Sequence, residues 1–109
     1  MDILELKGSD LPISIKMDIG EKTFIYEFVY RGFDDRIICN LYDEFDNEIC
    51  MGEKLVFGVP MFHFMQKDAL GNNNLNLPSR RLMPYSIDGK EVECGIIGLG
   101  IDYYLMFED

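Results

Sequence analysis

The sequence has one histidine and three cysteines, and this scarcity argues against metal and redox chemistry. A structural zinc site needs four ligands, usually cysteine or histidine, and His63, Cys39, Cys50 and Cys94 are scattered along the chain. The cysteine count is odd and no CxxC spacing occurs. A Cys39–Cys50 bridge across a hairpin is the alternative, but a reducing cytosol disfavours it. We therefore predict no metal site and no disulfide.

Basic residues are also scarce, with ten lysines and arginines against twenty aspartates and glutamates, a formal net charge of −10. Tight nucleic-acid binding depends on basic side chains that neutralise phosphates, so it is not expected. The negative charge is explained by solubility or by a basic partner surface. A more specific alternative is that the acidic residues line a passage that must not bind DNA.

Long apolar runs are absent, since no stretch approaches the roughly 18 residues of a membrane span. Residues 1–10 contain acidic residues and lack the apolar segment of a secretory signal, so we expect folding in a cytosol. A composition that is 48% hydrophobic argues against disorder. The length predicts one β-rich domain over residues 1–109, with residues 1–10 as an N-terminal arm or a short first strand.

The most organised stretch is residues 36–62. Apolar residues alternate over residues 37–41, a cluster of aspartates and an asparagine predicts a turn at residues 43–47, and alternation resumes at Ile49. Gly52 and Gly58 bracket a further apolar run. The pattern predicts a hairpin, a corner at Gly52, and a third short strand over residues 55–57.

Upstream of this stretch, alternation over residues 13–17 predicts a half-buried strand, and residues 23–31 give the strongest strand signal. In the second strand four aromatic residues share one face: Phe24, Tyr26, Phe28 and Tyr30. Ile25 and Val29 lie on the opposite face, which predicts a central strand or a face that meets a neighbouring subunit.

Downstream, residues 61–65 fit a short helix or a strand, and residues 67–77 predict a loop. Residues 81–87 predict an edge strand because Pro84 interrupts them, and residues 101–107 predict a closing strand. The fold class is therefore mainly β. We expect a single small barrel or sandwich of about 7–9 short antiparallel strands with at most one short helix.

Three stretches invite a chemical interpretation, and each is better explained by structure. His63 lies in an apolar run with no associated nucleophile motif. Gly95, Gly98 and Gly100 have the reverse order of a dinucleotide fingerprint and are interpreted as turn or bulge positions. Residues 43–48 lack the glycine and the second ligand of an EF-hand loop. We predict no catalytic, cofactor-binding or metal-binding residues, no cofactor, and no enzyme activity.

Several short motifs resemble the phage baseplate plug family of contractile tails and related particles. The turn motif is matched by Tyr42, Asp43, Asn47 and Ile49, and the corner motif by Gly52, Leu55, Val56, Gly58 and Val59. Met61 and Phe62 stand for an apolar pair, and residues 99–105 are similar to the closing strand. Asp46 replaces a glycine of the turn, and residues 72–74 are asparagines where glycines are common in the family.

The resemblance implies a structural protein of a contractile phage tail or phage-like particle, at the baseplate hub or the distal end of the tail tube. It further implies a homo-oligomer in a cyclic assembly, with other baseplate and tail-tube proteins as partners and no membrane contact. The protein would lie in the virion, and in the host cytoplasm during assembly. The alternatives are a small soluble binding or adaptor module with a β-barrel fold, unrelated to phage tails, and a small enzyme or ligand-binding barrel with a pocket around His63 or residues 72–74.

Overall fold

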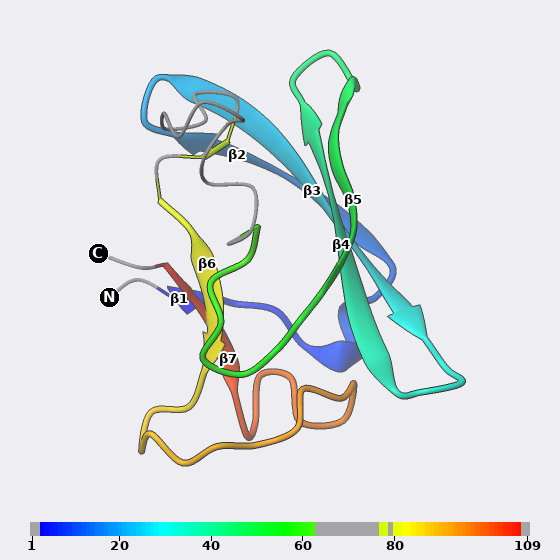
Figure 1. Cartoon of the computed structure of the whole chain (residues 1–109), viewed down its shortest axis with the longest axis vertical. Coiled ribbons are helices and arrows are strands. Elements are labelled where there is room, and N and C mark those ends of the chain that lie inside the picture. Colours follow the sequence, from blue (N-terminus) through cyan, green and yellow to red (C-terminus); the bar gives the residue numbers. More distant parts are fainter. Residues whose placement is uncertain (1–2, 63–76, 79, 108–109) are drawn as a thin grey trace, which may run out of the picture.

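The computed structural model describes residues 3–62, 77–78 and 80–107 of the chain (Figure 1). Within these residues seven strands form two antiparallel sheets, and the only helical element is a single 3₁₀ turn, η1 (Gly8–Asp10). No helix in this part of the chain is long and apolar enough to cross a membrane. The predicted mainly β fold is confirmed, and it is sandwich-like because the two sheets do not close into a barrel.

The larger sheet has the order β2-β3-β4-β5 and contains the strands predicted before and within residues 36–62. Its members are β2 (Ile13–Ile19), β3 (Lys22–Arg31), β4 (Arg36–Asp43) and β5 (Glu48–Lys54). β3 lies between β2 and β4, as apolar residues on both of its faces predict. Hairpins connect all three neighbouring pairs, so the sheet is built from consecutive segments.

The smaller sheet joins the two ends of the chain in the order β1-β7-β6. β1 (Ile3–Leu4) pairs with β7 (Tyr104–Phe107), which pairs with β6 (Leu82–Tyr85). Pro84 lies in β6 at the edge of this sheet, as predicted. The outer side of β6 is covered by residues 58–61, because the Gly58 N–H donates to the Pro84 carbonyl at 2.8 Å and the Met61 N–H donates to the Leu82 carbonyl at 2.8 Å.

The core fills the space between the two sheets. β3 contributes Phe24, Tyr26 and Phe28, which are all buried, and the Tyr26 and Phe28 rings stack with centroids 6.2 Å apart. Other buried members include Ile37, Cys39, Leu41, Leu55, Met61, Phe62, Leu82, Leu99, Tyr103 and Leu105. Tyr30, the fourth aromatic residue predicted on this face, is 41% exposed because it lies at the end of β3.

The predicted corner at Gly52 and third strand over residues 55–57 are wrong. β5 continues through Gly52 to Lys54, and the register with β4 is irregular along this stretch. Gly52 has φ 76°, which only glycine adopts readily, so the chain absorbs an irregularity there without leaving the sheet. The Leu55 N–H still donates to the Ile37 carbonyl at 3.0 Å, and the chain then turns without forming a new strand.

The closing strand is shorter than predicted, because β7 begins at Tyr104 and not at Ile101. The N–H groups of Ile101, Asp102 and Tyr103 all donate to the Gly98 carbonyl, at 2.9, 2.7 and 3.3 Å. This turn leaves Ile101 in solvent and buries Tyr103. Of the predicted helix or strand over residues 61–65, only Met61 and Phe62 are described, and they form a buried turn. The rest lies outside the described residues, as do residues 67–76 of the loop predicted over 67–77.

Candidate assembly surfaces

Three turns gather at one end of the molecule, the lower end in Figure 1. They are residues 32–35 between β3 and β4, residues 86–89 after β6, and residues 95–103 before β7. The tip of the β4–β5 hairpin, residues 43–48, lies at the opposite end (Figure 1). We call the first set the turn end and the second the acidic tip. The sandwich holds these two surfaces apart.

Asp35 connects two segments of the turn end. It has a positive φ of 51°, and its Oδ1 accepts hydrogen bonds from the Tyr30 hydroxyl at 2.9 Å and the Ile96 N–H at 3.3 Å. A Cβ on Gly95 would collide with the Asp35 carboxylate, so the close approach requires glycine. The Tyr103 hydroxyl donates to the Gly95 carbonyl at 2.7 Å in a buried position. The β3–β4 turn and the loop before β7 are therefore fixed to each other.

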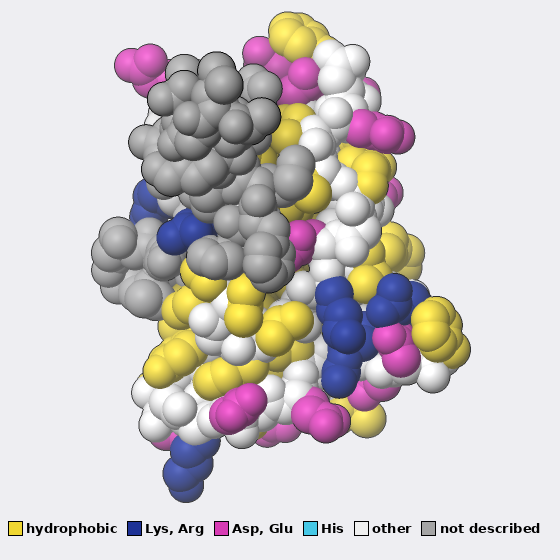
Figure 2. All heavy atoms as spheres, viewed as in Figure 1, with side chains coloured by type: hydrophobic (Ala, Val, Ile, Leu, Met, Phe, Trp, Pro, Cys, Tyr) yellow, Lys and Arg dark blue, Asp and Glu magenta, His cyan; other side chains and the backbone are white. Residues whose placement is uncertain are grey.

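The turn end exposes large apolar side chains. Four of them are more than two-thirds exposed: Phe33 at 86%, Ile97 at 84%, Ile87 at 76% and Ile101 at 70%. Figure 2 shows apolar side chains among acidic ones over the lower part of the molecule. Exposed apolar residues grouped on one part of a surface mark contact sites, whereas scattered ones need no explanation. Ile97 and Ile101 line one groove together, whereas Phe33 and Ile87 lie on the two other turns of this end.

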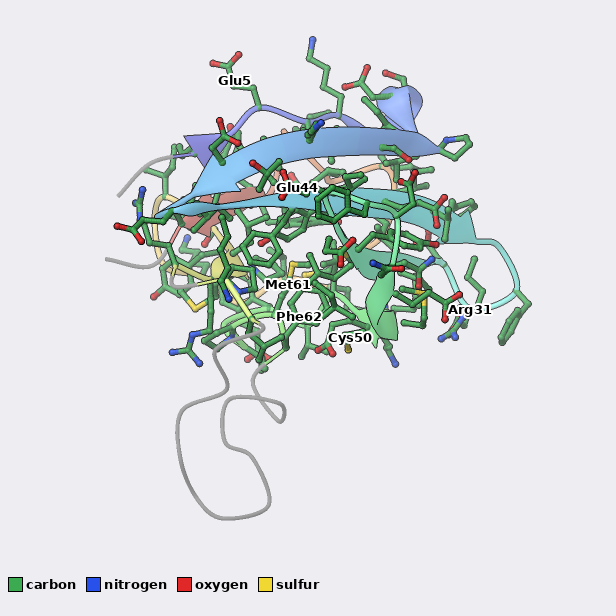
Figure 3. All side chains as sticks on the ribbon, turned by 90° about the horizontal axis from the view of Figure 1, so that it is seen from above. Glu5, Arg31, Glu44, Cys50, Met61 and Phe62 are labelled. Carbon is green, nitrogen blue, oxygen red and sulfur yellow. The ribbon has the colours of Figure 1, made fainter. Side chains whose placement is uncertain are left out.

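Near Phe33, a charged pair accompanies the apolar surface. Arg31 forms two hydrogen bonds with the Asp34 carboxylate, at 2.9 and 2.6 Å, and its guanidinium lies 5.0 Å from the centroid of the Phe33 ring. The hydrogen bond from Arg31 lowers the pKa of Asp34. Figure 3 shows Arg31 at the end of the sheet that carries this turn. The pair orders the β3–β4 turn at the molecular surface.

An open groove lies beside the apolar residues of the turn end. Its volume is about 600 Å³, and it is lined by η1 and the loop before β7: Lys7, Gly8, Ser9, Ile96, Ile97, Leu99, Gly100 and Ile101. Gly8 has no side chain at a point where a Cβ would collide with the Ile96 carbonyl. The groove is mainly apolar and presents no group of converging polar side chains among the described residues, so it suits protein contact better than a polar ligand.

The Asp43 carboxylate and backbone hydrogen bonds together order the acidic tip. Asp43 Oδ1 accepts from the N–H groups of Phe45 and Asn47 at 2.8 and 2.9 Å, and Oδ2 accepts from the Asn47 side-chain amide at 3.0 Å. The side-chain bond from Asn47 is the main reason that the pKa of Asp43 is lowered. Phe45 is exposed among the acidic residues Glu44, Asp46 and Glu48. A hollow of about 660 Å³ separates this tip from the β2–β3 turn.

The outer face of the larger sheet has a short polar network. The Glu27 carboxylate accepts from the Asn40 amide at 2.9 Å and from the Tyr42 hydroxyl at 3.2 Å. The Asn40 side-chain oxygen accepts from the Gly52 N–H at 2.7 Å, which ties the irregular part of β5 to β4. Partial burial and the Glu27 carboxylate raise the pKa of Tyr42. The network stabilises the sheet, because each of these polar side chains has a partner within it.

Comparison with known proteins decides the family. The model of the family described as "Cyanophage baseplate Pam3 plug gp18" matches residues 1–109, the whole chain. The chain belongs to this baseplate plug family. Membership implies a structural component of a phage baseplate. No curated protein matches the chain significantly.

The motifs that suggested the plug family are turn and core positions in the structure. Asp43 and Asn47 bond to each other across the hairpin tip, and Gly52 and Gly58 both have positive φ. Asp46, which replaces a glycine of the motif, also has a positive φ of 66°. Aspartate tolerates this conformation better than most residues. The substitution therefore preserves the turn.

Among the described residues, the candidate chemical residues do not form a site. Gly95, Gly98 and Gly100 form the turn before β7, and a strand comes directly after that turn, so they are turn positions as predicted. The three cysteines are free, with Cys39 and Cys94 buried. His63 and the asparagines at 72–74 lie outside the described residues. Within the part of the chain that the structure describes, no cluster of three or more His, Cys, Asp or Glu side chains could hold a metal ion.

Sequence reasoning missed the apolar residues of the turn end, although a signal was present. Phe33 lies between Gly32 and Asp34, and Ile87 precedes Asp88. Large apolar residues next to turn formers such as glycine and aspartate cannot reach a core easily, because turns lie at the surface. Ile101 belongs to the closing strand predicted over residues 101–107, and the turn at Gly98 instead exposes it.

Proposed function

We propose that the chain is an assembly protein of the central baseplate, at the hub or the distal end of the tail tube of a contractile tail or related particle. It acts through protein contacts as one β-rich domain of residues 1–109, without catalysis or cofactor. Several copies associate with cyclic symmetry, each copy using the same surfaces. Family membership and the apolar turn end support this proposal.

The observation that carries the proposal is the exposed set at the turn end. Four large apolar side chains on the three turns at this end would each gain free energy by burial, and two of them, Ile97 and Ile101, line the same apolar groove. In our proposal these residues contact neighbouring baseplate or tail-tube proteins. Charged side chains of both signs accompany them, including the Arg31 guanidinium over the Phe33 ring, which suits a partner with a mixed charged rim.

The acidic tip has a different role in this proposal. It lies at the end opposite the apolar contacts, and it presents Asp43, Glu44, Asp46 and Glu48 with the exposed Phe45. If the turn end is buried in the baseplate, the tip projects toward the passage through which DNA leaves, where negative charge prevents adhesion of phosphates. Cross-links from cysteines at positions 44 and 48 to neighbouring subunits would instead place the tip at a contact and contradict this part.

The first test is a mass-spectrometric inventory of tails purified from producing cells. We expect this chain at a fixed low ratio to the tube protein. Absence from tails, with abundant free protein in the lysate, would contradict the proposal and favour a soluble binding or adaptor module.

Variants then test the contact surface. In cells that lack the natural gene product, the double variant Ile97→Asp, Ile101→Asp should fold but be lost from tails. The control is Phe45→Asp at a comparably exposed apolar position at the opposite end, and because it adds one negative charge it is matched by the single variant Ile97→Asp. Circular dichroism of the purified variants checks their fold. Normal incorporation of the double variant would show that the turn end is not the assembly contact.

A further inference from the structure

β2 forms an open edge of the larger sheet. It pairs with β3 on one side, and no other strand in the described part of the chain lies along its second side (Figure 3). Its seven residues pair with β3 in an unbroken register and contain no proline. The opposite edge, β5, is irregular, and the outer side of β6 receives hydrogen bonds from residues 58–61. A long regular edge without such protection is a template for strand addition.

The hairpin register determines which backbone groups of β2 are available. Ile19 pairs with Lys22 across a two-residue turn, and such a turn is closed by a hydrogen-bonded pair. Hydrogen-bonded and non-hydrogen-bonded pairs then alternate along an antiparallel ladder. The N–H and C=O groups of Ser14, Lys16 and Asp18 therefore point away from β3 to the open edge.

We infer that two copies of this chain pair through their β2 edges, antiparallel, about a two-fold axis at Met17. In this register the outward-pointing groups of Lys16 bond with those of Asp18 of the second copy, and the reverse pair forms by symmetry. The lysine and aspartate side chains then lie directly opposite each other on the outer face, which gives two ion pairs. Both side chains are exposed in the single chain.

Neighbouring registers are disfavoured by charge. A shift of the strand register by two residues in one direction places Lys16 opposite Lys16 of the second copy. The same shift in the other direction places Asp18 opposite Asp18. Like charges directly opposite each other destabilise a strand pair, whereas opposite charges stabilise it. On the inner face the preferred register sets Met17 against its symmetry mate and Ile15 against Ile19. It thereby covers Ile15 and Met17, which are only half-buried at the open edge.

The pairing joins the four strands of each larger sheet into one continuous sheet. It is an isologous contact, in which the same patch serves both copies. The inference rests on the self-association in the proposed function. Its test needs only the purified chain and no tails, so its failure can be told from a failure of the baseplate assignment.

Charge exchange tests the register. Lys16→Asp places aspartate opposite Asp18, and Asp18→Lys places lysine opposite Lys16, so each variant alone should lose the dimer. We expect each to raise the dimer dissociation constant at least about tenfold in sedimentation equilibrium. When the two variants are mixed, both cross-strand pairs become attractive again, and the heterodimer should form with an affinity near that of the natural chain.

A control separates charge from hairpin stability. The Thr23 hydroxyl donates to Asp18 Oδ1 at 2.6 Å, and Asp18→Lys removes this bond too. Thr23→Val removes the bond without changing charge and should leave dimerisation intact. A cysteine at position 17, on the axis, should form an intermolecular disulfide, and one at position 15 should not. A natural chain that stays monomeric at millimolar concentration, or a dimer that ignores both charge changes, would overturn the inference.

Discussion

The hydroxyl of Tyr103 donates a hydrogen bond to the carbonyl oxygen of Gly95 at 2.7 Å, and both residues are buried. This bond fixes the loop before β7 at the point where Asp35 also approaches Gly95. The exposed Ile97 and Ile101 lie in the same loop. A buried side chain thereby positions apolar residues that lie in solvent, and the surface depends on the core for its shape.

Tyr103→Phe should lower the free energy of unfolding by about 1–3 kcal/mol, because it leaves the buried Gly95 carbonyl without its donor. Urea unfolding followed by circular dichroism measures the change. The control is Tyr104→Phe, because Tyr104 is the next residue and its side chain is only partly buried. If both substitutions lowered the free energy of unfolding equally, the hydrogen bond from Tyr103 to the Gly95 carbonyl would make no particular contribution to stability.

Two aspartates with positive φ should respond in opposite ways to glycine. Asp46→Gly should raise the free energy of unfolding by about 0.5 kcal/mol, because glycine adopts a φ of 66° without steric cost. Asp35→Gly should lower it by about 1 kcal/mol, although its φ is 51°, because the bonds from Tyr30 and Ile96 are lost. Thermal unfolding of both variants measures these changes in stability. A gain in stability from Asp35→Gly would mean that its side-chain bonds contribute little.

Thiol reagents should distinguish the three cysteines. Cys50 is only partly buried, whereas Cys39 and Cys94 lie in the core. Burial raises the pKa of all three thiols, so we expect slow labelling of Cys50 and protection of the other two until the protein unfolds. Labelling of the folded protein with a coloured disulfide reagent should give one thiol per chain. Cys50→Ser should abolish this signal, and labelling that persists would show that a core cysteine is accessible.

The strands were predicted well from the sequence because local patterns determine them. Residues 13–17 and 23–31 alternate clearly, and the aspartates of residues 43–47 specify a turn, so β2, β3 and the β4–β5 hairpin were expected. Pro84 similarly indicated an edge strand. These features depend on neighbouring residues, whose effects can be judged without knowledge of the fold.

The rest depends on contacts between distant segments. The sequence predicts a corner at Gly52. In the structure the Gly52 N–H donates a hydrogen bond to the Asn40 side-chain oxygen, which keeps β5 in the sheet. The hydrogen bond between Asp35 and Ile96 joins residues that are 61 positions apart, and no local pattern indicates it. The turn end could not be predicted for the same reason, since the β3–β4 turn and the loop before β7 meet only when the sandwich forms.

Alkaline pH should destabilise the protein in a defined range. Burial raises the pKa of Cys94 from 9.0 to about 11, and it also raises the pKa of Tyr103. Above pH 9 the unfolded chain releases the Cys94 proton while the folded chain retains it, so the unfolded state binds fewer protons and stability falls as pH rises. The contribution of Cys94 to the free energy of unfolding is fully present below pH 9. It falls by on the order of 2 kcal/mol as the pH rises to about 11.

Urea midpoints measured from pH 7 to 11 test this dependence, and Cys94→Ala serves as the matched variant. Alanine cannot titrate, so the variant should be less stable than the natural chain at about pH 7 but should lose less stability between about pH 9 and 11. The remaining decline comes from buried phenols such as Tyr103, whose hydroxyl must keep its proton to bond Gly95. Parallel pH curves for the two proteins would show that the Cys94 thiol does not contribute to alkaline unfolding.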